Sequence, residues 1–382
     1  MNFPARSCVA ALLGVALIST SPLERRGIVT VPRIHHRGDV ERSGSYHYPA
    51  IRTLPRVKWT KSQGTLFMGT PLSTKGKVYS GGSDGTLYAF DSQTGSAIWS
   101  ASGFDAIENA TVIAGDMIVA GGGNGAVRAL DRRTGKVIWS YDAGVMVSTA
   151  PLVVGDLVYV ATFQGLHALD LKSGERKWLA PVGDAPTFVS YPASHNGAVF
   201  LSAGSTLYAF DGATGRERWR VSSPKQFWSL CLGDRLLYVG NSDGNLIAYD
   251  QTNGQERWRF KSSYPTADEI WSAPAVAAGL VYVGSRDQSM VAVDALTGEK
   301  RWGFRTSGES VGDPVVSGGI VYFSDSNHAL PMGTRRLYAL DAGTGTEMWR
   351  YEVRSTLLTT PALGQGVIYE TITGQVMALT PR

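Results

Sequence analysis

A motif of the form Ala-x-Asp-x-x-Thr-Gly-x-x-x-Trp recurs seven times along the chain and constrains its fold more than any other feature. The first copy runs from Ala89 to Trp99, and two later copies carry Ser or Asn in place of Thr. With one further tryptophan before the first copy, the steps between successive tryptophans are 40, 40, 39, 41, 39, 44 and 47 residues. The eight tryptophans are Trp59, Trp99, Trp139, Trp178, Trp219, Trp258, Trp302 and Trp349. A period near forty residues is typical of a four-stranded propeller blade or of a helical repeat.

The residues between the tryptophans favour strands over helices. Short alternating runs such as Val158–Val160 are separated by Gly-containing turns such as Ser83–Gly85, a pattern typical of strands. Within the motif, Asp and Thr can hydrogen-bond the backbone of a tight turn, and Gly permits the positive φ that closes a hairpin. We therefore predict that the Ala lies near the end of one strand and the Trp in the next. Each of the eight indoles is expected to be a structural docking residue, wedged between neighbouring sheets.

The two ends of the repeat array predict how the ring closes. The segment Thr360–Leu379 carries strands and the Ala of the motif, but no tryptophan follows it. A strand that contains a tryptophan is present instead near the start, at Pro55–Trp59. We predict an all-β fold, an eight-bladed β-propeller of four-stranded antiparallel blades over residues 55–382. Its last blade is closed by both termini, which protects the edge strands.

The first 21 residues resemble a secretory signal peptide. Arg6 is followed by an apolar run from Cys8 to Ile18 and by small polar residues, the order found in such signals. A cytoplasmic protein with an apolar start is the alternative. Cys8 stands at the start of the apolar run and not after it, so no lipobox is present. No stretch of 18 or more apolar residues predicts a transmembrane segment in the mature chain. We expect an exported protein, periplasmic or extracellular.

Residues 22–54 form a basic lead-in arm. Residues 22–58 hold eight Lys or Arg against three Asp or Glu, whereas the rest of the chain is close to neutral. A near-neutral propeller gives no electrostatic support for nucleic-acid binding. We expect the arm to be a solvated segment laid against the first blade, with contact to anionic lipid or to a partner as the alternative. The tripeptide Arg37-Gly38-Asp39 is interpreted as a chance match to an adhesion sequence, and the arm's three histidines lack ligand spacing for a metal.

No catalytic, cofactor-binding or metal-binding residues are predicted from the sequence. The chain has two cysteines and six scattered histidines, and it lacks a nucleophile–base motif, a His-x-x-x-His pair and a Gly-rich phosphate loop. Two cysteines exclude a disulfide framework. Cys231, between two leucines, is expected to be a buried small apolar residue rather than a reactive thiol.

Four residues are candidates for contact with a partner. Trp228 and Trp271 break the forty-residue rhythm on predicted inner strands, so they either reach the mouth of the propeller funnel or pack between blades. The longest period contains an insertion, Ser324–Thr334, with Asp325 and His328. Insertions in repeat arrays often lie on the binding face, although a neutral loop extension explains this one equally well.

The repeat closely resembles the tryptophan-docking repeat of the pyrroloquinoline-quinone (PQQ)-type β-propellers. The resemblance rests on the seven motif copies and on preceding strands such as Val281-Tyr282-Val283-Gly284-Ser285. That family contains dehydrogenases with a quinone and Ca²⁺, and cofactor-free members such as the outer-membrane assembly lipoprotein of the Bam complex. The adjacent Cys-Cys pair, the long inserted loops and the calcium ligands of the enzymes are missing here, so the resemblance does not imply a cofactor.

The resulting prediction is a non-catalytic, exported, monomeric scaffold that binds other envelope proteins and holds no cofactor. Two alternatives remain open at this point. One is a PQQ- and Ca²⁺-dependent dehydrogenase, and the other is a carbohydrate- or peptide-binding sensor.

Overall fold

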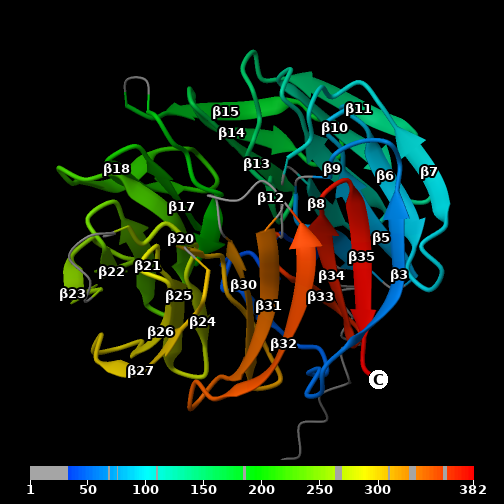
Figure 1. The fold of residues 1–382 in the computed structure, drawn as a ribbon. Helices are drawn as coiled ribbons and strands as arrows, with labels where there is room; N and C mark the ends of the chain where they lie inside the picture. Colours follow the sequence, from blue (N-terminus) through cyan, green and yellow to red (C-terminus); the bar gives the residue numbers. More distant parts are fainter. Residues whose placement is uncertain are drawn as a thin grey trace, which may run out of the picture. The chain divides into compact units, whose positions relative to one another are not determined.

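The strands form eight sheets arranged as blades around one axis (Figure 1). The computed structural model describes residues 33–67, 69–74, 76–108, 111–183, 186–262, 269–308, 310–326, 333–355 and 359–382. All regular structure within these ranges is β, which confirms the predicted eight-bladed propeller. The predicted signal peptide, residues 1–21, lies outside the described residues.

Each of the first four blades is a consecutive antiparallel run of four strands. Blade 1 holds β4 (Leu72–Thr74), β5 (Lys77–Gly81), β6 (Leu87–Asp91) and β7 (Ala97–Ala101); blade 2 holds β8 (Thr111–Ala114), β9 (Met117–Gly121), β10 (Ala126–Asp131) and β11 (Val137–Asp142); blade 3 holds β12 (Leu152–Val154), β13 (Leu157–Thr162), β14 (Gly165–Asp170) and β15 (Arg176–Pro181); blade 4 holds β16 (Ala193–His195), β17 (Ala198–Ala203), β18 (Thr206–Asp211) and β19 (Glu217–Ser222).

Blades 5 and 6 repeat this pattern, whereas blades 7 and 8 depart from it. Blade 5 holds β20 (Phe227–Leu232), β21 (Leu236–Asn241), β22 (Asn245–Asp250) and β23 (Glu256–Lys261); blade 6 holds β24 (Ala275–Ala277), β25 (Leu280–Gly284), β26 (Ser289–Asp294) and β27 (Lys300–Arg305); blade 7 holds β29 (Val315–Ser317), β30 (Ile320–Ser326), β31 (Gly333–Asp341) and β32 (Glu347–Ser355), with the short β28 (Ser310–Val311) beside β30; blade 8 holds β33 (Ala362–Gly364), β34 (Val367–Ile372), β35 (Gln375–Thr380) and β3 (Arg56–Ser62).

The last blade closes as predicted, because its outer strand comes from the N-terminal part of the chain. β3 pairs antiparallel with β35, and Trp59 lies opposite Ala378. In every blade the first strand is innermost. The turns between the first and second strands and between the third and fourth therefore lie at one end of the ring, here called the turn end. The segments that connect one blade to the next lie at the other, here called the connector end.

Seven indoles dock on the motif turn of the following blade, and the last, Trp349, docks on Ile51 of the lead-in arm. Their Nε1 atoms donate to carbonyl oxygens 2.8–3.1 Å away; the acceptors, in chain order of the tryptophans, are those of Ser92, Arg132, Leu171, Ala213, Gln251, Ala295, Ala342 and Ile51. The motif glycine makes this approach possible, since a Cβ at Gly135 would lie 2.7 Å from the Trp99 ring. Its φ of 74° is the left-handed conformation that the turn requires. How much each indole contributes to the stability of the ring stays a prediction.

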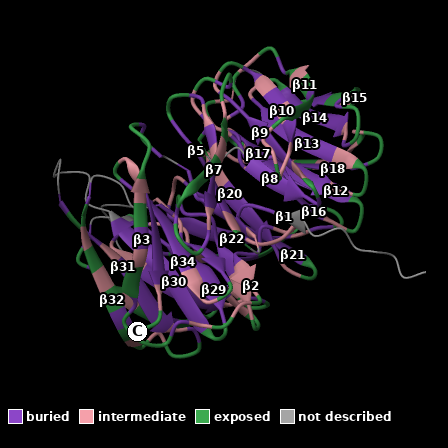
Figure 2. Cartoon of the chain, turned by 90° about the vertical axis from the view of Figure 1, so that its right-hand side faces the viewer, coloured by how far each residue is buried: buried purple, intermediate pink, exposed green. Residues whose placement is uncertain are grey.

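The core is divided among the interfaces between blades. One cluster of buried residues, for example, joins Val119 and Val127 of blade 2 to Val158 and Leu169 of blade 3. Figure 2 shows the inner and middle strands largely buried, with exposed residues in turns, in connections and along outer strands such as β3 and β32. Each blade interface is therefore a separate apolar layer, and the docked indole closes the outer part of that layer.

Replacing one docked indole is expected to destabilise the ring strongly. Trp139 is only 7% exposed and packs within the interface of blades 2 and 3. Trp139→Ala should lower the free energy of unfolding by about 3–5 kcal/mol, as for other buried large-to-small changes. Chemical denaturation measures this, with Trp271→Ala as the control because that indole is 38% exposed and outside the docking set. A loss below about 1 kcal/mol for Trp139→Ala would contradict the docking role.

The lead-in arm is built into the ring, so the expectation of a solvated segment laid against the first blade is wrong for the described part of it. β1 (Arg33–Ile34) pairs with β8 of blade 2, and β2 (Ser45–Tyr46) pairs in parallel with β29 of blade 7. Between them, carbonyl oxygens of the arm accept from the inner strands of blades 4, 5, 6 and 7 at 2.7–2.9 Å; the pairs are Val40–Ser194, Glu41–Leu232, Ser43–Val276 and Gly44–Val316. The arm thus links successive inner strands at the turn end.

Within the described ranges, no helix reaches the length and hydrophobicity that crossing a membrane requires.

Candidate functional site

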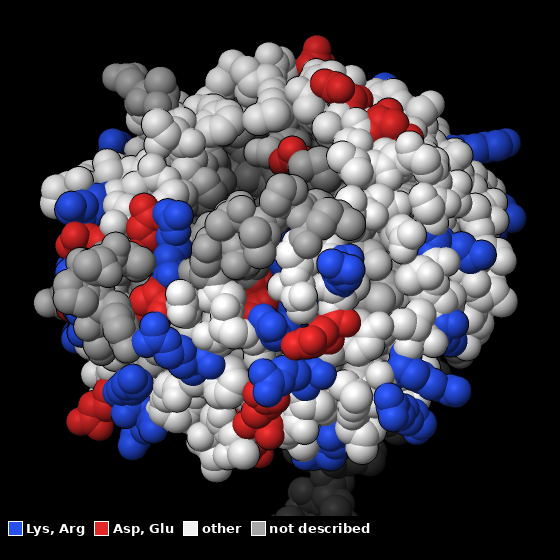
Figure 3. Space-filling view, in the orientation of Figure 1, with Lys and Arg blue, Asp and Glu red and all other residues white. Residues whose placement is uncertain are grey.

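The connector end of the ring is hollowed at its centre in the space-filling view (Figure 3). At this end, Trp228 lies at the start of the inner strand β20, and Trp271 lies in the segment that leads into β24. Trp228 is half-buried and packs edge-on against Phe188 of the neighbouring connection, with ring centroids 5.3 Å apart. Trp271 is 38% exposed. Each interpretation therefore applies to one residue. Trp228 packs against the connection of a neighbouring blade, and Trp271 presents its ring to solvent.

Asp325, the third candidate, is directed into its own blade. It is 1% exposed; its carboxylate accepts from the Tyr338 hydroxyl at 3.0 Å and from the Arg336 backbone N–H at 2.9 Å. Burial raises the pKa of this carboxyl, and the hydrogen bonds oppose that shift. In this arrangement Asp325 anchors strands β30 and β31 to each other. The fourth candidate, His328, lies outside the described residues.

The sequence analysis missed two arginines of the lead-in arm that occupy the axis of the ring. Arg42 donates to the carbonyl oxygens of His36, Ala150, Pro151 and Pro192 at 2.7–3.1 Å. These bonds tie blades 3 and 4 to the arm. Burial lowers the pKa of Arg42 to about 10, which leaves it charged at neutral pH.

Arg37 does the same on the opposite side of the ring. Its Nη2 donates to Pro274 at 2.6 Å and to Pro314 at 3.1 Å, and its Nη1 lies 3.3 Å from Asp313. The innermost strand of each sheet has one edge with no strand beside it. Buried carbonyl oxygens along this edge therefore need hydrogen-bond donors from another part of the chain. The repeat period could not reveal these residues, since both arginines lie before the first repeat.

A buried histidine of the lead-in arm lies near these two arginines. His36 is 2% exposed, and neither ring nitrogen has a hydrogen-bond partner. Its ring lies 4.7 Å from that of Tyr191. Burial, and then the charges of Arg42 and Arg37, hold the pKa of His36 well below its usual value. The imidazole is therefore neutral at physiological pH.

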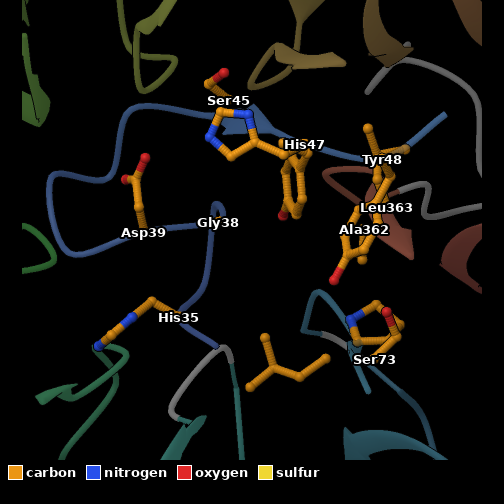
Figure 4. Close-up of a pocket in the computed structure, with 12 residues that line it drawn as sticks. His35, Gly38, Asp39, Ser45, His47, Tyr48, Ser73, Ala362 and Leu363 are labelled. Carbon is orange, nitrogen blue, oxygen red and sulfur yellow. The ribbon is translucent and has the colours of Figure 1, made fainter. Parts of the chain in front are cut away.

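Two cavities border the arm at the turn end. The first, of about 230 Å³, lies between the arm and the inner strands of blades 1 and 8. Figure 4 shows His35, His47 and Tyr48 from the arm on its wall, with Ser73 and Leu363 from the blades. His35 is already engaged, because its Nε2 lies 3.2 Å from both the N and O atoms of Val153.

The second cavity, of about 630 Å³, lies between the arm and the turns of blades 5 and 6. Glu41 and His195 contact each other on its wall, with 3.5 Å between Oε1 and Nδ1. Burial raises the pKa values of Asp39 and Glu41. The remaining wall is mainly apolar and includes Leu296, the most exposed of the large apolar residues described.

These groups do not form a recognisable catalytic or metal centre. In the part of the chain that the structure describes, no three His, Cys, Asp or Glu side chains lie together as a metal site. A protein Ca²⁺ site takes six to eight oxygen ligands, usually with several carboxylates, and the described residues do not supply such a set. Cys231 is buried, and burial raises its pKa to about 12, so it is an unreactive thiol as expected.

One buried carboxyl predicts a pH dependence of stability. Glu370 is fully buried between blades; Oε2 accepts from the Thr359 hydroxyl at 3.2 Å, and Oε1 has no partner. Burial raises the pKa of Glu370 well above its usual value, so the folded state keeps the carboxyl protonated to a higher pH than the unfolded state does. The unfolded state ionises it above about pH 4.3. Stability from this group is therefore present at low pH and lost as pH rises toward the folded pKa.

Glu370→Gln is expected to stabilise the protein at pH 8 and to change little at pH 4. The gain should grow by about 1.4 kcal/mol per pH unit between the unfolded and folded pKa values. Urea denaturation at several pH values measures it, with Glu299→Gln as the exposed control. An equal gain at both pH values would contradict a buried, protonated Glu370.

Comparison with family models decides the family. The model described as outer membrane protein assembly factor BamB matches residues 52–260, 185–329 and 316–382, which together span every blade. The chain belongs to this family. A comparison with curated protein sequences gives no significant match.

Solved structures similar to this BamB-family chain share its fold but are proteins of different kinds. BamB from Moraxella catarrhalis is 21% identical, with a TM-score of 0.68 over 86% of this chain and 98% of that one. The computationally designed protein Ika8 is 17% identical, with a TM-score of 0.73 over 84% and 98%. A europium-containing methanol dehydrogenase is 15% identical, with a TM-score of 0.73 over 89% and 96%. At these identities the likeness shows the fold alone, since BamB, a designed protein and a dehydrogenase all share it.

Proposed function

We propose that this protein is a non-catalytic, exported β-propeller that acts as a protein-interaction scaffold in the bacterial envelope. The observation that carries the proposal is the match of the BamB family model across all eight blades. Its partners are other envelope proteins, including those that assemble the outer membrane, and the scaffold itself is a monomer that holds no cofactor.

The arrangement of the side chains along the axis of the ring supports a binding role over catalysis. The arm's own arginines donate to carbonyl oxygens of residues that directly precede the inner strands. Near the connector end, the exposed ring of Trp271 offers an aromatic contact, and tryptophan is enriched at binding hot spots. The described acidic and histidine side chains are scattered or internally paired rather than converging on one reactive centre.

The scaffold role is tested in the bacterium that makes the protein. Deleting the gene should lower the amounts of outer-membrane β-barrel proteins, and the full-length wild-type gene should restore them. The purified, tagged chain should also retain envelope proteins from a detergent extract. A Trp271→Ala variant should retain less at unchanged stability. Normal outer-membrane protein levels in the deletion strain would overturn the assembly role.

The cofactor-free state is tested directly. Neither PQQ nor Ca²⁺, alone or together, should shift the melting temperature or give saturable heat in calorimetry. No artificial electron acceptor should be reduced with alcohols or sugars. The reason is the lack of converging carboxylates among the described residues and of an adjacent Cys-Cys pair in the sequence. Saturable quinone binding with Ca²⁺-dependent turnover would instead make the protein a dehydrogenase.

A further inference from the structure

The outer strands of the blades differ in charge. The two residues before each docking tryptophan and the one after it are Glu, Arg and Arg in blades 4 and 5, and Glu, Met and Arg in blade 7. Blades 3 and 6 carry Arg-Lys and Lys-Arg before the tryptophan. Blades 1 and 2 carry no charge at these positions: β7 reads Ala-Ile-Trp-Ser-Ala, and β11 reads Val-Ile-Trp-Ser-Tyr-Asp.

The charged residue just before the tryptophan has a defined partner in blades 3 to 6. It pairs with the Asp of the motif in its own blade, on the carboxylate oxygen that the turn does not use. The pairs are Lys177–Asp170 at 3.7 Å, Arg218–Asp211 at 2.8 Å, Arg257–Asp250 at 2.7 Å and Arg301–Asp294 at 2.7 Å. A basic side chain at this strand position therefore reaches the motif aspartate.

In blades 1 and 2 this basic side chain is replaced by isoleucine. Ile98 and Ile138 are 44% and 50% exposed. Hydrogen bonds from the turn lower the pKa values of Asp91 and Asp131, so both carboxylates are ionised at neutral pH. Within the described ranges, neither aspartate makes the ion pair that its counterparts make in blades 3 to 6, and only the Oδ1 atom of each accepts a hydrogen bond.

These two strands are also sheet edges. β7 and β11 are each the last strand of their sheet, so the outer row of backbone N–H and C=O groups has no strand beside it. They lie on adjacent blades on the right of Figure 1; Figure 3 shows charged side chains crowded over the lower half of this face and sparser over the upper right. Proteins usually protect exposed edges with charged residues, as the outer strands of blades 4 to 7 do here.

We propose that the outer edges of β7 and β11 form a docking surface for an extended segment of a partner protein, which adds to one of these edges as a further β-strand. The segment carries aliphatic residues against Ile98 or Ile138 and a Lys or Arg that pairs with Asp91 or Asp131. This inference deepens the proposed scaffold function and rests on it. Backbone pairing supplies affinity in strand addition, and side-chain contacts supply specificity.

The charge pattern favours a different protein over a second copy of this chain as the occupant. If two copies paired through β7 or β11, neither edge would bring a basic residue, because both strands lack Lys and Arg. The aspartates would then gain no ion pair from the second copy. A basic residue on another protein's strand satisfies them, in the way that Arg218 satisfies Asp211 within blade 4.

The test uses the chain's own blades as the template for variants. Ile98→Arg combined with Ile138→Arg should recreate the internal ion pairs of blades 4 to 6, occupying both aspartates and charging both edges. The melting temperature should therefore stay close to that of the parent. Met348→Arg is the matched control, since Met348 holds the same strand position in blade 7 and is 37% exposed.

The probe is a fluorescent ten-residue peptide of alternating Val and Thr with one central Arg, measured by anisotropy against the full chain. The parent and Met348→Arg should bind it equally, and the double variant should bind about tenfold more weakly. A peptide with Glu in place of Arg should also bind about tenfold more weakly. Equal binding by parent and double variant, or no binding by the parent, would overturn the proposal.

Two further measurements separate the possible failures. Light scattering that shows a dimer, dispersed by the double variant, would assign these edges to self-association and overturn the proposal. If the double variant still retains the envelope proteins that the parent retains, the scaffold function stands and this docking surface is wrong. If the parent retains none, the scaffold function itself fails.

Discussion

Deleting residues 50–59 is expected to open the ring and to lower the melting temperature by about 10 °C or more. The deletion removes the first four of the seven residues of β3, including Trp59, which is buried and pairs with β35. It also removes Ile51, whose carbonyl oxygen is the acceptor for the last docked indole, Trp349, at 2.8 Å. Both interfaces of blade 8 are affected at once, so the loss should exceed that of any single tryptophan.

Differential scanning calorimetry measures this effect. The control changes the exposed face of the same strand, with Arg56→Ala and Thr60→Ala, and should keep the melting temperature within a few degrees of the parent. Trp59→Ala is the milder variant if the deletion cannot be purified, and about 3–5 kcal/mol should be lost. A deletion variant that melts like the parent would show that blade 8 does not need its N-terminal strand.

The number of blades and the ring closure could be predicted from the sequence because both rest on local chemistry that repeats. In each copy, Asp and Thr build the same turn, and Gly leaves room for the preceding blade's indole. Asp131, for example, accepts from both the backbone N–H and the hydroxyl of Thr134 at 2.7 Å. Since a period of about forty residues sets the register, the missing tryptophan strand at one end could be matched to Trp59 at the other.

The path of the lead-in arm could not be predicted, because it obeys no period. Its contacts join residues more than a hundred positions apart, such as Arg42 with Ala150 and Arg37 with Pro314. A run of basic residues in a sequence usually indicates a solvated segment. Here two basic residues of the arm, Arg37 and Arg42, are buried instead, because they donate to carbonyl oxygens beside the inner strands. Those acceptors come together only in the folded ring.

The candidate site residues illustrate the same limit. Trp271 is exposed and Trp228 is packed, although both break the tryptophan rhythm in the same way. Asp325 belongs to an insertion, yet it bonds to Tyr338 and Arg336 inside its blade. The isoleucines of β7 and β11 can be read directly from the sequence. Their link to the motif aspartate could not be predicted, because only the structure shows that a basic residue at this position reaches that aspartate.

The buried arginine of the arm gives the second large expected effect. Arg42 is 1% exposed and donates to four carbonyl oxygens, three of them on residues just before the inner strands of blades 3 and 4. Arg42→Met keeps the length and most of the volume of the side chain but removes every donor. Each buried carbonyl left without a partner costs about 1–3 kcal/mol. Because the buried charge is removed together with its desolvation cost, part of that loss is offset.

We therefore expect Arg42→Met to lower the free energy of unfolding by about 3–5 kcal/mol. Arg42→Lys should recover only part of it, since one ammonium cannot reach four acceptors spread around a planar guanidinium. Arg52→Met is the matched control: Arg52 is exposed and donates to one carbonyl, that of Gly318, so its loss should stay below about 1 kcal/mol. Urea denaturation of the three variants tests the order. If Arg42→Met were as stable as Arg52→Met, the arm would be an attachment to a ring that closes without it, rather than part of what holds the inner strands together.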